Sequence, residues 1–147
     1  MKKQKTKDLD SQQRLPVRRK GMPDLMGKKI LLADDEVNIR TSLTDILEEC
    51  GYEVIHAANG QETMERVRRE NPDLVLLDTI MPGIGGIEVC HQIKQVEKLP
   101  CKVIVYTGKI DAIDAVKARE AGADEYCIKG ADPAILIEVV KKLICSE

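Results

Sequence analysis

Hydrophobic residues follow two alternating spacings from Lys28 onward, and the alternation predicts strands and helices in turn. Short apolar runs bounded by polar, Gly or Pro positions predict five strands, at about 28–33, 53–56, 74–77, 103–106 and 125–128. Helical spacing and helix-end signals predict five helices, at about 39–50, 60–69, 86–96, 111–121 and 133–144. The runs at 74–77 and 103–106 are apolar at every position, which is typical of strands covered on both faces of a parallel sheet.

Strands that alternate with helices in this way predict an α/β fold. We expect a doubly wound, five-stranded parallel sheet of order 2-1-3-4-5 with five helices, the flavodoxin-like arrangement, because right-handed crossovers leave few alternatives. In such sheets ligands bind beyond the carboxyl ends of the strands, near the switch point between strands 1 and 3. Polar residues that follow these strands are therefore the first candidates for function.

Charge divides the chain into two parts. The 147 residues sum to a net charge of −2, which combines +5 over residues 1–27 with −7 over the remainder. Residues 1–27 lack a sustained apolar period, so we expect a disordered basic extension there and one folded domain over 28–147. We expect no DNA-binding or other output domain on this chain. An acidic body also disfavours a DNA-binding surface, which needs clustered cations.

Composition removes several classes of protein. There is no Trp or Phe and there are three Tyr, which argues against a nucleic-acid site built on stacked aromatics. The five cysteines are odd in number and show no zinc spacing, so we expect free thiols in a reducing cytoplasm. No apolar run approaches the length of a membrane span.

Chemistry-bearing residues end four of the predicted strands: Asp34-Asp35, Asp78, Thr107 and Lys129. Three carboxylates placed together repel one another, and a hard divalent cation such as Mg²⁺ would compensate their charge. An Asp at such a site can attack phosphorus, and Asp78, after the central buried strand, is the best nucleophile. Thr107 supplies a hydroxyl donor and Lys129 a fixed cation. Taken singly, Asp34 or Asp35 is equally consistent with capping the following helix.

The runs LLADDE at 31–36 and LLDTIMPG at 76–83, followed by Gly86, Thr107 and Lys129, resemble the receiver domain of two-component response regulators, including stand-alone regulators like those of chemotaxis. The resemblance covers about residues 28–145. It implies that Asp34, Asp35, Asp78 and the backbone carbonyl of Ile80 hold Mg²⁺. It also implies that Asp78 accepts a phosphoryl group from a histidine kinase or a histidine phosphotransfer protein, and that Thr107 and Lys129 grip the phosphoryl oxygens.

The same resemblance assigns further positions. Tyr126 matches the aromatic switch residue and Thr107 the hydroxyl switch residue, while Ile80 and Lys109 occupy two tuning positions. The surface of the fourth helix, fifth strand and fifth helix would engage a downstream protein or a second copy of the chain. Most receivers carry proline after this lysine, whereas Gly130 stands here, and glycine reaches unusual dihedral angles. That departure bears on the geometry of the switch more than on phosphorylation.

Other functions remain open at this point. The leading hypothesis is a phosphorylation-activated switch that acts through protein contacts, regulatory rather than enzymatic beyond its own phosphorylation and dephosphorylation. The chain could equally be a receiver excised from a larger regulator or hybrid kinase. A small aspartyl-phosphate phosphatase would need a second acid where Ile80 stands. A flavin carrier would need a Ser/Thr/Gly-rich phosphate loop where Asp34 and Asp35 stand.

Overall fold

The computed structural model describes residues 27–108, 112–130 and 132–145 of the chain. The five strands are β1 (Lys29–Ala33), β2 (Glu53–Ala57), β3 (Leu74–Leu77), β4 (Lys102–Thr107) and β5 (Glu125–Ile128). The helices are α1 (Val37–Glu49), α2 (Gly60–Glu70), α3 (Gly86–His91), the π-helix η2 (Gln92–Val96), α4 (Ala112–Ala121) and α5 (Pro133–Cys145).

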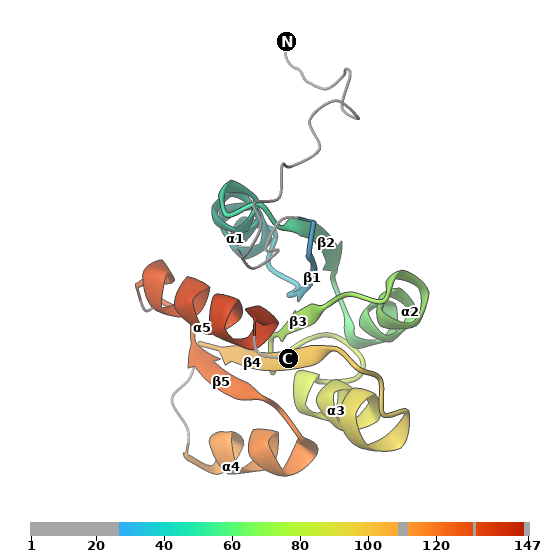
Figure 1. Ribbon diagram of the computed structural model, residues 1–147. Coiled ribbons are helices and arrows are strands. Elements are labelled where there is room, and N and C mark those ends of the chain that lie inside the picture. The colour runs from blue at the N-terminus through green and yellow to red at the C-terminus, as the bar shows by residue number, and fades with distance from the viewer. Residues whose placement is uncertain (1–26, 109–111, 131, 146–147) are drawn as a thin grey trace.

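All four strand pairings are parallel and the order is β2-β1-β3-β4-β5, as predicted. Helices α1 and α5 cover one face of the sheet, and α2, α3 and α4 cover the other (Figure 1). β3 lies in the middle and its four side chains are fully buried, which agrees with its unbroken apolar run. The sheet therefore separates two hydrophobic layers.

Alternate side chains of the strands feed these two layers. Leu31, Val75 and Val103 pack with the helices α2, α3 and α4, while Leu32, Leu76 and Ile104 pack with α1 and α5. Successive residues of a strand point to opposite faces, so one apolar strand supplies both cores. One side of α5 is buried and its rim is exposed, since Leu136, Val140 and Ile144 are buried while Ile135 is 55% exposed.

The predicted helix over 86–96 changes type halfway. α3 continues into the π-helix η2, whose Lys94 Nζ lies 3.0 Å from Asp124 Oδ2 and donates to the carbonyl of Cys101. Gln95 Nε2 donates to the carbonyl of Glu120, in the last turn of α4. The wider turn thus brings two successive side chains of η2 to the end of α4, a use typical of π segments as local adjustments to tertiary contacts.

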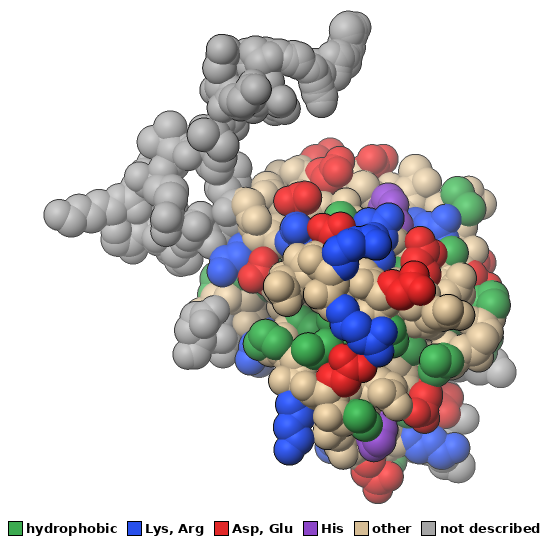
Figure 2. All heavy atoms as spheres, turned by 90° about the vertical axis from the view of Figure 1, so that its right-hand side faces the viewer, with side chains coloured by type: hydrophobic (Ala, Val, Ile, Leu, Met, Phe, Trp, Pro, Cys, Tyr) green, Lys and Arg blue, Asp and Glu red, His purple; other side chains and the backbone are tan. Residues whose placement is uncertain are grey.

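The surface that carries α2 and α3 mixes charges of both signs with scattered hydrophobic side chains (Figure 2). Ion pairs account for part of this pattern, since Arg68 bonds both carboxylate oxygens of Glu97, at 3.1 and 2.6 Å. All five cysteines are free, as expected. Within the described ranges no helix combines the length and apolarity that crossing a membrane requires. Residues 1–26 lie outside the description, so the expected basic extension stays a prediction.

Candidate functional site

The sheet ladder carries the predicted site residues to one edge. The backbone N–H of Asp34 donates to the carbonyl of Ala57, and that of Asp78 donates to the carbonyl of Ala33, so both acids still belong to the sheet as β1 and β3 end. Parallel strands end at the same edge, which is why residues far apart in the sequence meet there. Asp34 is fully buried and Asp78 is 6% exposed, whereas Asp35 is exposed.

These three acids form one cluster. One carboxylate oxygen from each of Asp34, Asp35 and Asp78 lies within 4.8 Å of the other two. Asp34 Oδ1 accepts a 2.9 Å hydrogen bond from the backbone N–H of Glu36, and Asp78 Oδ1 accepts a 3.4 Å bond from that of Ile80. In the loops after β1 and β3, the carboxylate therefore accepts a hydrogen bond from the backbone N–H two residues further on, and this restrains the position of both acids.

The helix-capping alternative for Asp34 or Asp35 is wrong. The residue before the first turn of α1 is Glu36, and no side chain caps the helix there. Asp34 Oδ1 instead bonds a residue that precedes the helix, and Arg40 of α1 donates to the backbone carbonyl of Asp34. The two acids are thus placed at the sheet edge, and α1 is fixed to Asp34 through Arg40.

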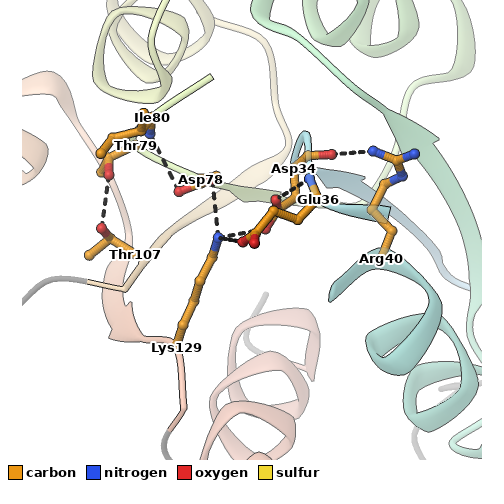
Figure 3. A network of polar contacts seen from close by, with 8 residues as sticks. All are labelled: Asp34, Glu36, Arg40, Asp78, Thr79, Ile80, Thr107 and Lys129. Atoms are coloured by element: carbon orange, nitrogen blue, oxygen red, sulfur yellow. Dashed lines mark hydrogen bonds and ion pairs between the residues drawn. The ribbon is translucent and has the colours of Figure 1, made fainter. Parts of the chain in front are cut away.

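Lys129 reaches into the cluster from the end of β5. Its Nζ lies 2.7 Å from Asp34 Oδ2, 3.1 Å from Asp78 Oδ2 and 3.6 Å from Glu36 Oε1 (Figure 3). The same atom lies 5.7 Å from the ring centre of Tyr106. The Lys129 side chain is 12% exposed. One ammonium group therefore partly balances several carboxylates in a largely buried site.

The pKa values in the site follow from burial and from this pairing. Burial raises the pKa of Asp78, and the hydrogen bond and attraction of Lys129 only partly oppose it. Burial alone would lower the pKa of Lys129, but its bonds to Asp34 and Asp78 outweigh this and raise it. Lys129 therefore stays protonated at neutral pH, and burial keeps Asp78 a more basic carboxylate than usual.

Thr107, at the end of β4, meets a partner that sequence reasoning missed. Thr79 Oγ1 donates a 2.8 Å hydrogen bond to Thr107 Oγ1, and Thr107 is 2% exposed. The backbone N–H of Lys129 donates to the Thr107 carbonyl at 2.6 Å, so β4 and β5 hold their two site residues in register. A threonine that follows Asp78 was an available signal, because a hydroxyl at a strand end can bond across to the next strand.

Glycines shape the loop after β3. A Cβ on Gly86 would lie 1.9 Å from the Asp78 carbonyl oxygen, and one on Gly60, in the first turn of α2, would lie 2.2 Å from the Ile84 carbonyl oxygen. Asn59 caps α2 by accepting from the N–H of Glu62. The loop after β3 thus packs against the first turn of α2 at Ile84, and its end at Gly86 packs against its beginning at Asp78.

The remaining predicted positions fall in different places. Ile80 is 65% exposed beside Asp78, and Tyr126 is half-buried against the layer that includes α4. Gly130 has φ +85°, a left-handed conformation that glycine adopts readily, so the departure from proline matches the backbone found there. Lys109 lies outside the described residues.

The donor set fits a hard divalent cation. Three carboxylates suit Mg²⁺, which prefers oxygen ligands and retains several waters. Asp34 Oδ2 is buried, and the Lys129 ammonium group lies 2.7 Å from it. Asp34 is one of the three clustered acids, so a bound cation would share its carboxylate with Lys129.

Comparison with known proteins supports one family. Residues 30–141 match the family model of the response regulator receiver domain. The chain is 41% identical over 119 residues to the alkaline phosphatase synthesis transcriptional regulatory protein PhoP of Bacillus subtilis, covering 81% of this chain and 49% of PhoP. It is 35% identical over 118 residues to the DNA-binding response regulator MtrA of Mycobacterium tuberculosis, covering 80% and 51%. The chain thus spans about half the length of these relatives.

Solved structures agree with the sequence comparison. The BeF3-activated N-terminal receiver domain of Klebsiella pneumoniae RstA superposes with a TM-score of 0.76 at 26% identity, over 80% of this chain and 98% of that one. A CheY-like response regulator receiver domain protein from Methanospirillum hungatei superposes with a TM-score of 0.75 at 33% identity, over 80% and 94%. The similarity covers nearly the whole length of these receiver domains.

Proposed function

This chain belongs to the response regulator receiver domain family of two-component signalling, and from that membership we propose that it is a switch controlled by phosphorylation of Asp78. One observation carries the proposal: the Asp78 carboxylate ends the central strand, lies within 4.8 Å of two further carboxylates, and is paired with Lys129. The family match supports neither a small phosphatase nor a flavin carrier, and Ile80 stands where the phosphatase would need a second acid.

The proposed reaction transfers a phosphoryl group to Asp78. A carboxylate oxygen of Asp78 attacks phosphorus, and the bond from phosphorus to the donor atom breaks, with its electron pair leaving on the histidine nitrogen of a phosphorylated partner or on acetate. Lys129 Nζ and the Thr107 hydroxyl would pair with the phosphoryl oxygens. Phosphoryl transfer depends mainly on positioning and charge compensation, which a few fixed groups can provide.

We propose Mg²⁺ as the cofactor, held by Asp34, Asp35, Asp78 and the backbone carbonyl of Ile80. Bound there, the ion would neutralise charge that develops on the phosphoryl oxygens. The protein groups would orient the incoming donor against Asp78 and hold the phosphorylated product. Beyond its own phosphorylation and dephosphorylation we assign the chain no enzymatic activity.

The proposed partners follow from the family. A histidine kinase or histidine phosphotransfer protein would donate the phosphoryl group, and a downstream protein or a second copy would bind the α4-β5-α5 surface, where Tyr126 would act as a switch with Thr107. Whether the output lies on a separate protein or on a longer version of this chain, the chemistry at Asp78 is the same. Five free thiols support a cytoplasmic location.

The test is modification of Asp78 by a small phosphodonor. The wild type, Asp78→Asn and Asp45→Asn are incubated with acetyl phosphate and MgCl2, and intact mass spectrometry measures the phosphorylated fraction. Asp45 is an exposed acid of α1 outside the cluster and serves as the matched control. We expect phosphorylation of the wild type and of Asp45→Asn and none of Asp78→Asn. An unmodified wild type, or equal modification of Asp78→Asn, would contradict the proposal.

A further inference from the structure

The residue after the phosphoacceptor bonds the threonine of the neighbouring strand. The Thr79 and Thr107 side chains point toward one another, with 2.8 Å between their hydroxyl oxygens, and Asp78 lies beside this pair at the end of β3 (Figure 3). We propose that Thr79 is a positioning residue for phosphoryl transfer, which acts by holding the Thr107 hydroxyl in one orientation. This inference rests on the function proposed above for Asp78.

The backbone of Thr79 is held in place by contacts that do not involve its side chain. Its carbonyl oxygen accepts a 3.1 Å hydrogen bond from the N–H of Gly86, at the start of α3. A Cβ on Gly86 would lie 3.1 Å from the Thr79 Cα, and one on Gly85 would lie 3.2 Å from the Thr79 carbonyl oxygen. Two glycines thus permit the first turn of α3 to pack closely onto Thr79. Its hydroxyl therefore extends from a backbone that has little room to move.

The hydrogen bond from Thr79 restricts the orientation of the Thr107 side chain. Its side chain is buried, and its backbone carbonyl is bonded to the N–H of Lys129, so the position of the Thr107 Cα is set by the sheet. Rotation about the Cα–Cβ bond is the freedom that the sheet does not restrict, and threonine divides between rotamers according to the hydrogen bonds that its hydroxyl makes. A bond from Thr79 selects one rotamer.

The direction of the bond determines its effect on catalysis. A hydroxyl can accept and donate at the same time. With Thr79 as donor, the Thr107 oxygen is the acceptor of this bond. The Thr107 hydroxyl hydrogen is not used in it, so Thr107 can donate that hydrogen to a phosphoryl oxygen. Donors fixed before reaction stabilise developing charge without paying for reorganisation during it. Loss of the Thr79 hydroxyl should therefore slow transfer. With the direction reversed, Thr79 would compete for that proton and its loss would speed transfer.

The experiment compares Thr79→Val, which keeps the branched shape without the hydroxyl, with Thr79→Ser, which keeps the hydroxyl. The rate of phosphorylation by acetyl phosphate is measured for the full chain over a range of Mg²⁺ concentrations, in the wild-type and Thr107→Val backgrounds. We expect Thr79→Val to lower the maximal rate about five-fold, the effect of one hydrogen bond. We expect Thr79→Ser to restore it to within about two-fold. The Mg²⁺ concentration for half-maximal rate should not change.

The Thr107→Val background separates positioning from general loop damage. If Thr79 acts through Thr107, then Thr79→Val has no further effect once the Thr107 hydroxyl is absent. Thr41→Val, at an exposed position of α1, is the matched control and should react like the wild type. A Thr79→Val rate equal to or above that of the wild type, or an equal loss in both backgrounds, would overturn the inference. A wild type that is not phosphorylated at all would instead overturn the proposed function, and this inference with it.

Discussion

Replacing Lys129 with methionine tests whether its ammonium group holds the acid cluster together. Nζ lies 2.7 Å from Asp34 Oδ2 and 3.1 Å from Asp78 Oδ2, in a side chain that is 12% exposed. Methionine keeps most of the aliphatic stem, so the substitution removes the charge with little change in packing. Two largely buried carboxylates then face each other without this cation.

The cost follows from the burial of the pair. Removing one partner of a buried ion pair costs roughly 3–5 kcal/mol. Asp35 in the cluster and Glu36 beside it are both exposed, so water reaches the rim of the cluster and the lower value applies. We therefore expect Lys129→Met to lower the free energy of unfolding by about 3 kcal/mol, or roughly 150-fold in the unfolding equilibrium. A domain with ordinary stability remains folded after such a loss.

The pH dependence has a definite sign. Burial raises the pKa of Asp78 in the folded protein, and without Lys129 the main opposing contact is lost. A carboxyl whose pKa is higher when folded destabilises the fold as pH rises through that pKa. The deficit of Lys129→Met should thus be largest at neutral pH and shrink as the pH falls through the raised pKa of Asp78. The raised pKa of Lys129 affects stability in a different pH range. Its contribution to the free energy of unfolding is full below the pKa of the unfolded state and is lost only at alkaline pH.

Urea unfolding followed by circular dichroism, with and without MgCl2, measures these effects. At Mg²⁺ concentrations about 100 times the dissociation constant, binding adds about 2.7 kcal/mol. Lys129→Met should gain more from Mg²⁺ than the wild type, in which Nζ already pairs with the same oxygens. Lys141→Met, at an exposed position of α5, is the control. Full stability of Lys129→Met, an equal loss in Lys141→Met, or a Mg²⁺ response no larger than that of the wild type would refute this reasoning.

Three further substitutions test other features of the structure. Gly60→Ala should destabilise the fold by about 2 kcal/mol in urea unfolding, although alanine favours helices, because its Cβ would lie 2.2 Å from the Ile84 carbonyl oxygen; a gain in stability would contradict this. The Tyr52 hydroxyl is buried without a hydrogen-bond partner among the described residues, and burial raises the pKa of Tyr52 to about 12. Tyr52→Phe should therefore raise the free energy of unfolding by about 1 kcal/mol in urea unfolding. A clear loss of stability would contradict this and argue for a bound water. Apolar Ile80 cannot orient an attacking water, so phosphorylated Asp78 should persist for minutes or longer in mass-spectrometric time courses and Ile80→Asn should shorten that lifetime; loss of wild-type phosphate within seconds would contradict the idea.

Much of the fold was predictable because its signals are local. A strand covered on both faces must be apolar throughout, and the run at Leu74–Leu77 has no other simple interpretation. Gly51, Asn71 and Gly122 end helices or turns with positive φ, where the chain reverses. Once five strands alternate with helices, the handedness of crossovers leaves few sheet orders. The meeting of Asp78 with the other strand-end residues then follows from the fold.

What could not be predicted depends on contacts between distant segments. The spacing at 86–96 fits an ordinary helix, and the change to a π-helix reflects the bonds of Lys94 and Gln95 to the region after and within α4. The capping role for Asp34 or Asp35 was a local inference, whereas the pairing of Asp34 with Lys129 arises because β1 and β5 end at the same edge of the sheet. A threonine directly after Asp78 is a weak signal by itself, because nothing local indicates that the end of β4 lies within reach of the Thr79 hydroxyl.

The charge balance of the site explains why a divalent cation and Lys129 would have different roles. Three carboxylates and one ammonium group leave two negative charges, and the raised pKa of Lys129 keeps it protonated at neutral pH. An incoming phosphoryl donor is itself an anion, so the cluster with Lys129 alone would repel it. Asp34, Asp35, Asp78 and Lys129 would be neutral together with a bound divalent cation, and Lys129 would then be available to pair with phosphoryl oxygens. Phosphorylation of Asp78 should therefore depend on Mg²⁺ even though the site already contains a cation.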